Sequence, residues 1–534
     1  MKTTKISLCI ALILSSHLGQ LAAQDRAAVD ARSIIAKTRS GAVRGVTLNA
    51  ETHLCVFRGI PYAAPPVGAL RWRPPQPVAP WDGVRECTEF GAPAPQKANT
   101  NGGDPGSEDC LFLNVWTRRV GEPQAKLPVM VWIHGGGLNK GSGHKEMYEG
   151  SGFAQRAVVL VTINYRLGAL GFLAHPGLSA ESDHGVSGNY GFLDQIAALK
   201  WVHDNIAAFG GDPDNVTIFG ESAGGTSVSV LCASALAKGL FHRAILQSPW
   251  MFGYTTKLAE PNFVRLKKPV AGTPSAEELG VTWAAKYTGK SGAAAIRQLR
   301  QLPLEELLAK TAYYRTRATI DGWLLPNHPT LVFAAGQQAD VPTMIGTTSD
   351  EGNYFLAWIK LADRTEFANK LRDFYSDAAE ELAKAFPSSN AKELRQASSR
   401  FVTDSWFVQP SRQMLQGMDT VKSPAFQYEF ARPSRAFPAL GAPHAIELRY
   451  VFNTLKDREN RPKDQVLADT VTDCWVRFAK TGNPNGGSLS RWPEYRNDTG
   501  EYIQFGHEIR IGSNLHGATC DALDQASRGI WARD

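Results

Sequence analysis

The sequence predicts an α/β protein in which helices cover a mostly parallel central sheet. The first half of the chain alternates apolar, β-branched runs with stretches of helical periodicity, and this alternation is typical of parallel strands joined by crossover helices. Several of the apolar runs end in glycine-rich or polar loops. Because the carboxyl ends of parallel strands meet at one edge of a sheet, we expect the functional residues to gather there.

The hydrophobic pattern predicts the individual elements in order. Residues 127–137 and 157–168 begin as nearly continuous apolar runs, as expected for strands buried on both faces. Residues 191–213 carry apolar side chains at helical spacing until glycines and a proline end the helix. Further strands are expected at 215–219, 241–249 and 341–352.

Two later segments, around 255–320 and 360–440, are predicted to be helical insertions. Both are charged and contain few strand-like runs. No linker rich in Pro, Gly or Ser isolates them from the rest of the chain. We therefore expect one domain over residues 24–534, with these helices forming a lid and the walls of a pocket.

The first 23 residues are predicted to be a signal peptide. Lys2 and Lys5 precede the short apolar run 6–16, and small residues follow at 21–25. A run of this length is too short to span a bilayer, which takes about 20 residues. We therefore expect an exported protein, periplasmic or secreted, without a membrane span.

Charge and cysteine content exclude several classes of function. The formal charge is +6, and removing the two signal-peptide lysines leaves +4 without any block of like charge, which argues against nucleic acid as a partner. Six cysteines remain after Cys9 leaves with the signal, and none forms a C-x-x-C pair. An exported protein permits disulfides, and we favour Cys87–Cys110, which closes a short loop.

The segment "FGESAGG" at 219–225 contains a candidate nucleophile. Ser222 lies between a predicted strand and a run of small residues that can open a helix, with Gly220 and Gly224 two positions away on either side. This strand–turn–helix setting is typical of a nucleophile elbow. The alternative is a small residue in a tight connection. Catalysis requires a base, an acid to orient it and donors for an oxyanion.

The segment "HGGG" at 134–137 supplies candidate oxyanion donors. It follows a predicted buried strand, the position of the hole-forming motif in lipases and esterases. Gly136 and Gly137 are expected to donate their N–H groups beside that of Ala223. His134 borders the glycines, and we expect it to be structural rather than the base.

Candidates for the acid and base follow in the chain order serine, acid, histidine. Asp350 and Glu351 stand directly before Gly352 at the end of a predicted strand. His444 lies in a loop before an apolar stretch. His507 and His516 remain open as alternative bases.

Motifs over nearly the whole mature chain resemble those of the type-B carboxylesterases, which include the cholinesterases and have the α/β-hydrolase fold. The resemblance implies that Ser222 is the nucleophile, Glu351 the acid and His444 the base. It implies an oxyanion hole at Gly136, Gly137 and Ala223, and a structural ion pair of Arg71 with Glu108. The motifs that carry the resemblance, in family order, are "FRGIPYAAPPVGALRW" (57–72), "EDCLFLNVW" (108–116), "HGGG", "NYRLGALGFL" (164–173), "GNYGFLDQIAALKWV" (188–202), "GDPDNVTIFGESAGG" (211–225), "GLFHRAILQSP" (239–249), "DGWLLP" (321–326), "DEG" (350–352), "PHAIEL" (443–448) and "FAKTGNPN" (478–485).

The expected activity is hydrolysis of a small or medium-sized carboxylic ester through an acyl-enzyme, with no metal or organic cofactor. An amide or thioester hydrolase is the enzymatic alternative, because it uses the same tetrahedral chemistry. A non-catalytic binding protein of the same fold is the other, although such relatives have typically lost the serine.

Departures from the family pattern bear on the substrate. Ala94 replaces the usual cysteine, and residues 97–107 lack the tryptophan that holds choline in cholinesterases, so a choline ester is not expected. The loop 138–150 and the predicted lid instead carry positive charge that can attract a carboxylate-bearing ester. The alternative is that these side chains are solvated and bind nothing. The residues concerned are Lys140, His144, Lys145, Arg315 and Arg317.

Overall fold

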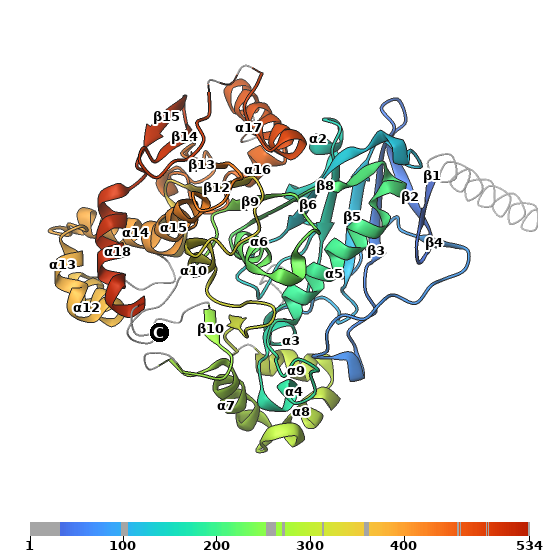
Figure 1. The fold of residues 1–534 in the computed structure, drawn as a ribbon, viewed down its shortest axis with the longest axis horizontal. Helices are drawn as coiled ribbons and strands as arrows, with labels where there is room; N and C mark the ends of the chain where they lie inside the picture. The colour runs from blue at the N-terminus through green and yellow to red at the C-terminus, as the bar shows by residue number, and fades with distance from the viewer. Residues whose placement is uncertain are drawn as a thin grey trace, which may run out of the picture.

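A computed structural model gives the fold (Figure 1). It describes residues 33–97, 105–251, 263–269, 273–311, 314–356, 363–456, 459, 461–487, 489 and 491–531. The predicted signal peptide, residues 1–23, lies outside the described residues. Within them, no helix combines the length and the apolar character that crossing a membrane would require.

The centre of the fold is one large twisted sheet. Its neighbouring strands follow the order β1-β2-β3-β5-β7-β6-β8-β9-β12-β13-β14-β15, with β4 beside β2. The strands from β7 through β14 run parallel, whereas β1, β2, β3 and β5 form an antiparallel edge and β15 returns antiparallel to β14. The strands are β1 Ser33–Thr38, β2 Gly41–Asn49, β3 Leu54–Pro61, β4 Val84–Glu86, β5 Phe112–Thr117, β6 Leu127–Ile133, β7 Val159–Ile163, β8 Gly211–Glu221, β9 Arg243–Gln247, β12 Thr343–Thr348, β13 Ala425–Phe430, β14 Glu501–Phe505 and β15 Ile509–Ser513.

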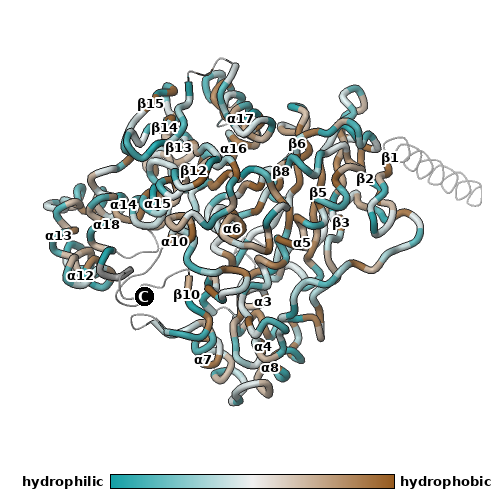
Figure 2. Tube along the Cα trace, viewed as in Figure 1, coloured by the Kyte–Doolittle hydropathy of each residue, from teal (hydrophilic) through white to brown (hydrophobic). Residues whose placement is uncertain are grey.

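The predicted strands form the parallel core of this sheet. β6, β7, β9 and β12 fall within the predicted strand segments, and every residue of β7 and β12 is buried. β8 contains the predicted strand 215–219 but begins earlier, at Gly211, in residues that were predicted to end a helix. Figure 2 shows hydrophobic residues along these central strands. The observed sheet with helices on it confirms the predicted α/β class, and it brings the carboxyl ends of β6, β8, β9, β12 and β13 to one edge.

Helices cover both faces of the sheet. One apolar core joins the sheet to α5, α6, α10 and α15, and a second joins the opposite face to α2, α16 and α17. These helices are α2 Ser151–Ala154, α5 Tyr190–Asn205, α6 Ala223–Ala233, α10 Pro329–Ala334, α15 Gln409–Met418, α16 Leu448–Val451 and α17 Pro462–Thr481. The short helices α3 Gly168–Phe172 and α11 Glu351–Phe355 follow the ends of β7 and β12, and α4 Pro176–Ser179 follows α3.

The remaining helices lie in two peripheral groups, at the bottom and the left of Figure 1. The first group is α7 Ala276–Thr288, α8 Gly292–Gln301 and α9 Leu304–Thr311; the second is α12 Arg364–Tyr375, α13 Ala379–Ala383, α14 Ala391–Thr403 and α18 Gly517–Trp531. The segments predicted to be helical also contain strands. β10 Phe263–Arg265 pairs with β11 Ala318–Ile320, and β13 lies within 360–440 as a strand of the central sheet.

The predicted Cys87–Cys110 disulfide is wrong for this structure, in which both residues are buried free thiols. The carbonyl of Cys87 accepts from the N–H of Arg58, whereas Leu111, next to Cys110, accepts from Tyr62. The two cysteines thus lie beside different residues of the segment 58–62, and no disulfide joins them. Cys55, Cys232, Cys474 and Cys520 are free as well.

Candidate active site

Ser222 occupies the sharp turn between β8 and α6. Its backbone adopts φ 58° and ψ −123°, a strained conformation for a residue with a side chain. Its N–H donates to the carbonyl of Gln247 on the neighbouring strand β9 (2.9 Å), and the residue is 9% exposed. The glycines on either side are required, because a β-carbon on Gly224 would lie 2.0 Å from the Ile133 carbonyl oxygen and one on Gly220 would lie 2.6 Å from Gly224.

The glycine loop after β6 lies against this turn. A β-carbon on Gly135 would come within 3.1 Å of the Ser222 β-carbon. Gly136 and Gly137 have φ values of 115° and 64°, which glycine adopts readily. The hydrogen bonds found in the described part of the chain leave the N–H groups of Gly136, Gly137 and Ala223 unused.

His134 is embedded in the core beside this loop. It is fully buried, its ring stacks on Tyr165, and Nδ1 contacts the Gly135 carbonyl at 2.8 Å. Burial lowers the pKa of His134 to about 3. The imidazole is therefore neutral and fixed in place, as expected for a structural residue.

Glu351 and His444 form a close pair. Nδ1 of His444 lies 2.5 Å from Oε2 of Glu351. The other carboxylate oxygen accepts from the N–H of Thr348 (2.8 Å) and the hydroxyl of Ser248 (2.5 Å). Ser248 was not predicted; it ends β9 in a positive-φ turn (42°), and its only signal in the sequence is its place after a strand. Glu351 is therefore held at three points, with one of its oxygens on the imidazole.

Asp350 has a different position from Glu351. Its Oδ2 accepts from the N–H of Ala442 (2.9 Å) and the Ser349 hydroxyl (2.7 Å). Asp350 thus braces the loop that leads to His444 without contacting the imidazole. The structure thus distinguishes Asp350 from Glu351, between which the local sequence pattern alone did not choose.

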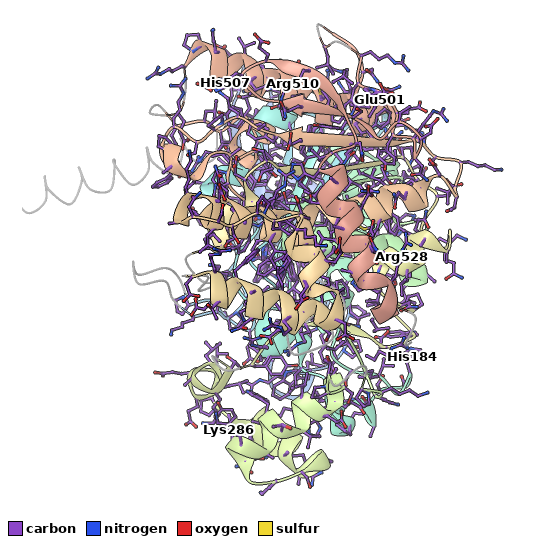
Figure 3. All side chains as sticks on the ribbon, turned by 90° about the vertical axis from the view of Figure 1, so that its left-hand side faces the viewer. His184, Lys286, Glu501, His507, Arg510 and Arg528 are labelled. Atoms are coloured by element: carbon purple, nitrogen blue, oxygen red, sulfur yellow. The ribbon has the colours of Figure 1, made fainter. Side chains whose placement is uncertain are left out.

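The two alternative histidines lie elsewhere. His507 is exposed in the turn between β14 and β15 and is labelled in Figure 3. Its Nδ1 lies 2.5 Å from the Arg432 guanidinium. His516 contacts Asp404 at 2.5 Å at the start of α18. Neither is brought to Ser222.

Glu221 adds a second carboxylate to His444. Its Oε1 lies 3.0 Å from Nε2 of the imidazole. Burial raises the pKa of Glu221 to about 7. Burial by itself lowers the pKa of His444, but the charges of Glu221 and Glu351 outweigh it and raise that pKa to about 9. No hydrogen bond links His444 to the Ser222 hydroxyl among the described residues, and such bonds often tighten only when substrate binds.

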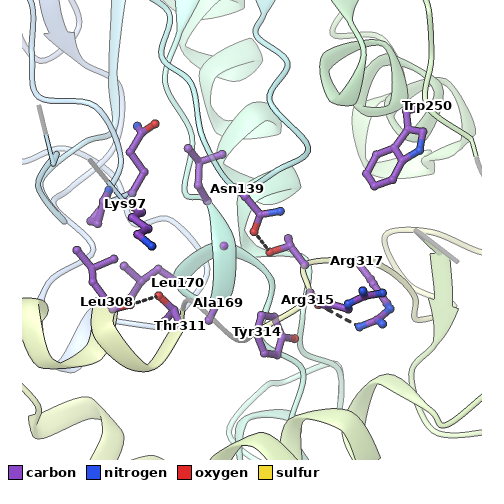
Figure 4. A pocket seen from close by; sticks show the side chains of 15 residues that line it. Lys97, Asn139, Ala169, Leu170, Trp250, Leu308, Thr311, Tyr314, Arg315 and Arg317 are labelled. Carbon is purple, nitrogen blue, oxygen red and sulfur yellow. Dashed lines mark hydrogen bonds between the residues drawn. The ribbon is translucent and has the colours of Figure 1, made fainter. Parts of the chain in front are cut away.

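A cavity of about 470 Å³ opens beside the glycine loop (Figure 4). Of the predicted substrate-binding residues, Arg315 and Arg317 line it, together with Lys97, which was not predicted. The other three are not among its lining residues: Lys140 is exposed, His144 stacks on Phe90, and the Lys145 ammonium lies 5.9 Å from the Tyr148 ring centre.

Comparison with known proteins identifies the family of this chain. The sequence profile of the carboxylesterase family matches residues 32–523. The chain is 36% identical over 515 residues to a fumonisin B1 esterase of Sphingopyxis macrogoltabida, covering 93% of this chain and 91% of that protein. It is 35% identical over 504 residues to the para-nitrobenzyl esterase of Bacillus subtilis, covering 89% and 96% of the two.

A solved structure shows the same fold. The carboxylesterase EST55 of Geobacillus stearothermophilus superposes with a TM-score of 0.78 at 33% identity, over 91% of this chain and 99% of that one. The match of profile, relatives and fold extends over nearly the full described chain, and we conclude that this protein belongs to the carboxylesterase family of ester hydrolases.

Proposed function

We propose that the protein hydrolyses carboxylic esters in two steps through an acyl-enzyme on Ser222, with Glu351 and His444 completing a triad. The observation that carries this proposal is the 2.5 Å contact of His444 with Glu351 near a serine held in a strained turn. A serine hydroxyl needs an oriented base to become a nucleophile.

The steps follow from these positions. Ser222 attacks the ester carbonyl while its proton passes to Nε2 of His444. The N–H groups of Gly136, Gly137 and Ala223 stabilise the oxyanion that forms. The intermediate collapses, and the alcohol leaves with the proton from His444. Water then attacks the acyl-enzyme by the same route, releasing the acid and restoring the serine.

Glu351 keeps the imidazole oriented and stabilises the imidazolium that forms during each step. Glu221 lies on the opposite nitrogen and favours the same charged form. No step requires a metal or an organic cofactor. We further propose that the protein is exported, because residues 1–23 have the pattern of a signal peptide.

The relatives' names refer to chemically different esters, so no single relative defines the substrate. The cationic cavity supports a carboxylate-bearing ester, and its apolar lining suits a small or medium-sized chain.

A fluorophosphonate probe tests the proposal, because it labels only an activated serine. We expect one labelled peptide, containing Ser222, and parallel loss of labelling and of ester turnover in Ser222→Ala. Ser234→Ala, a change at the far end of α6, serves as the control and retains both. Labelling and turnover that survive in Ser222→Ala would contradict the mechanism. Matched ester, thioester and amide substrates with one acyl group then establish which bond the enzyme prefers.

A further inference from the structure

Among the residues that the structure describes, the charged side chains lining the cavity beside the glycine loop are all positive. Fifteen described residues line it, and they include Lys97, Arg315 and Arg317 but no Asp or Glu. Figure 4 shows the two arginines and Trp250 toward one end of the view and Lys97 toward the other. Apolar side chains, among them Leu170 and Leu308, also line the cavity. A cavity wall of this kind suits an apolar chain that ends in an anion.

The arginine end of the cavity is joined to the glycine loop by one side chain. Asn139 donates from Nδ2 to the carbonyl of Gly137 (2.7 Å), and its Oδ1 accepts from the hydroxyl of Thr316. Thr316 stands between Arg315 and Arg317 in the chain. A group bound by the arginines is therefore two hydrogen bonds away from an expected oxyanion donor.

A second connection runs to the elbow. Trp250, which lines the arginine end, accepts through its carbonyl from the Thr226 hydroxyl (2.7 Å). Thr226 in turn donates its N–H to the carbonyl of Ser222 (2.9 Å). Thr316 and Trp250, which lie at the arginine end of the cavity, are thus each linked through hydrogen bonds to the candidate active site.

We propose that Arg315 and Arg317 form a subsite for a carboxylate that the ester substrate carries away from its scissile bond. This inference rests on the proposed function, since it assigns a substrate class to the same site. Guanidinium groups bind carboxylates through paired, charge-assisted hydrogen bonds. Nη1 of Arg317 donates to the Arg315 carbonyl (3.1 Å), which fixes the two residues relative to each other.

The electrostatics of the pair favour an anion. Burial lowers the pKa of both guanidinium groups, and the charge of Arg317 lowers that of Arg315 further. These are the costs of placing two cations close together, with Arg317 partly buried and Arg315 exposed, and a bound carboxylate relieves them. Lys97 at the other end adds a longer-range attraction that salt screens.

Two matched pairs of substrates test the subsite and locate the carboxylate. Mono-(4-nitrophenyl) adipate and 4-nitrophenyl hexanoate differ by a carboxylate on the acyl side. The butyrate esters of 4-hydroxybenzoate and of 4-hydroxybenzamide differ by one on the alcohol side. We expect the wild-type enzyme to prefer the acid in one of these pairs, and the pair that shows it identifies the side.

The double variant Arg315→Gln/Arg317→Gln is expected to lower that acid-to-neutral ratio of kcat/KM about 10-fold or more, the usual effect of losing a charged hydrogen-bond partner, with the neutral ester unchanged. Lys97→Gln is expected to reduce it less, mainly at low salt. Arg395→Gln, an exposed cation on α14, is the control and leaves the ratio as it is. An unchanged ratio in the double variant, or an equal loss for acid and neutral esters, would overturn the subsite.

Binding of adipate separates this inference from the proposed function. Calorimetry on the Ser222→Ala variant is expected to detect adipate, and the signal is lost when the two arginines are replaced as well. If no ester is turned over but adipate binding depends on the arginines, the subsite stands and the proposed function fails. If esters are hydrolysed but neither adipate nor 4-hydroxybenzoate, the charged alcohol of the second pair, binds, the subsite is wrong.

Discussion

Oε1 of Glu221 lies 3.0 Å from Nε2 of His444, the nitrogen that accepts the Ser222 proton in the proposed mechanism. The imidazole is thus placed between two carboxylates, since Glu351 contacts Nδ1 at 2.5 Å. Two negative charges stabilise the imidazolium. They favour proton transfer to His444 during the reaction, but they also raise its pKa, so that in the free enzyme His444 loses its proton only at higher pH. This relationship has direct consequences for the pH dependence of the enzyme.

Glu221→Gln is expected to shift the acid limb of the kcat/KM profile to lower pH by about one unit or more. His444 acts as a base only when neutral, so activity rises as pH increases through its pKa of about 9. Removing one carboxylate lowers that pKa, and the variant reaches a larger share of its own maximum at pH 7. Rates measured from pH 5 to 10 check this. Glu501→Gln, at the start of β14 next to the edge strand β15, is the control, and identical acid limbs for Glu221→Gln and wild type would refute the relationship.

Gly136→Ala is expected to lower kcat by about 100-fold, the typical effect of losing one oxyanion donor. Its β-carbon would lie 2.0 Å from the Lys140 carbonyl oxygen, so the loop must move. Gly83→Ala is the control, because Gly83 also has a positive φ (74°) but open space around its β-carbon. Steady-state kinetics together with a thermal unfolding scan distinguish a loss of catalysis from a loss of folding. A well-folded Gly136→Ala variant with near-normal kcat would place the oxyanion elsewhere.

Asn139→Ala is expected to lower kcat about 10-fold with little change in KM for a neutral ester. Asn139 is a positioning residue, since its side chain holds the Gly137 carbonyl and so orients the glycine loop. Thr316→Val removes only the outer hydrogen bond and is expected to have a smaller effect. A rise in KM at constant kcat would instead indicate that Asn139 contributes only to ground-state binding.

Arg71→Met is expected to lower the free energy of unfolding by about 3–5 kcal/mol, the range for breaking a buried ion pair. Arg71 contacts Glu108 through two 2.6 Å hydrogen bonds, and its remaining donors reach carbonyls at the end of α8. Both side chains are nearly buried, at 6% and 11% exposure. Arg44→Met, which breaks a pair with the exposed Glu86, is expected to cost less than about 1 kcal/mol. Equal costs in urea denaturation would contradict this assignment.

Local pattern predicted the strands of the parallel core well because those strands are buried on both faces. Residues 127–133 and 159–163 are nearly continuous apolar runs, so the pattern does not also fit an amphipathic helix or a half-exposed strand. β13 was not separated from its helical surroundings, because it carries Gln427 and Glu429 within an otherwise aromatic strand. Both polar side chains are buried, and Glu429 accepts a hydrogen bond from Gln504, a contact that no local pattern reveals.

The candidate site shows the same division. Ser222, the glycine loop and the pair Asp350–Glu351 were identified from strand ends and spacing. Glu221 was overlooked although it precedes Ser222, because its contact with His444 joins segments 223 residues apart. Lys97 was overlooked for the same reason, since its cavity is lined by several distant segments.

The sequence by itself determined the order of strands and helices, the turn at Ser222 and the set of groups available for acyl transfer, because these depend on hydrophobic period and glycine placement within a few residues. Only the tertiary structure shows the contacts themselves: Glu351 lies against His444, as the family resemblance implied, Cys87 and Cys110 are not bonded, and two arginines rather than three residues of the loop 138–150 line the cavity. Each of these depends on distances between segments far apart in the chain, and packing of the sheet and its helices sets those distances.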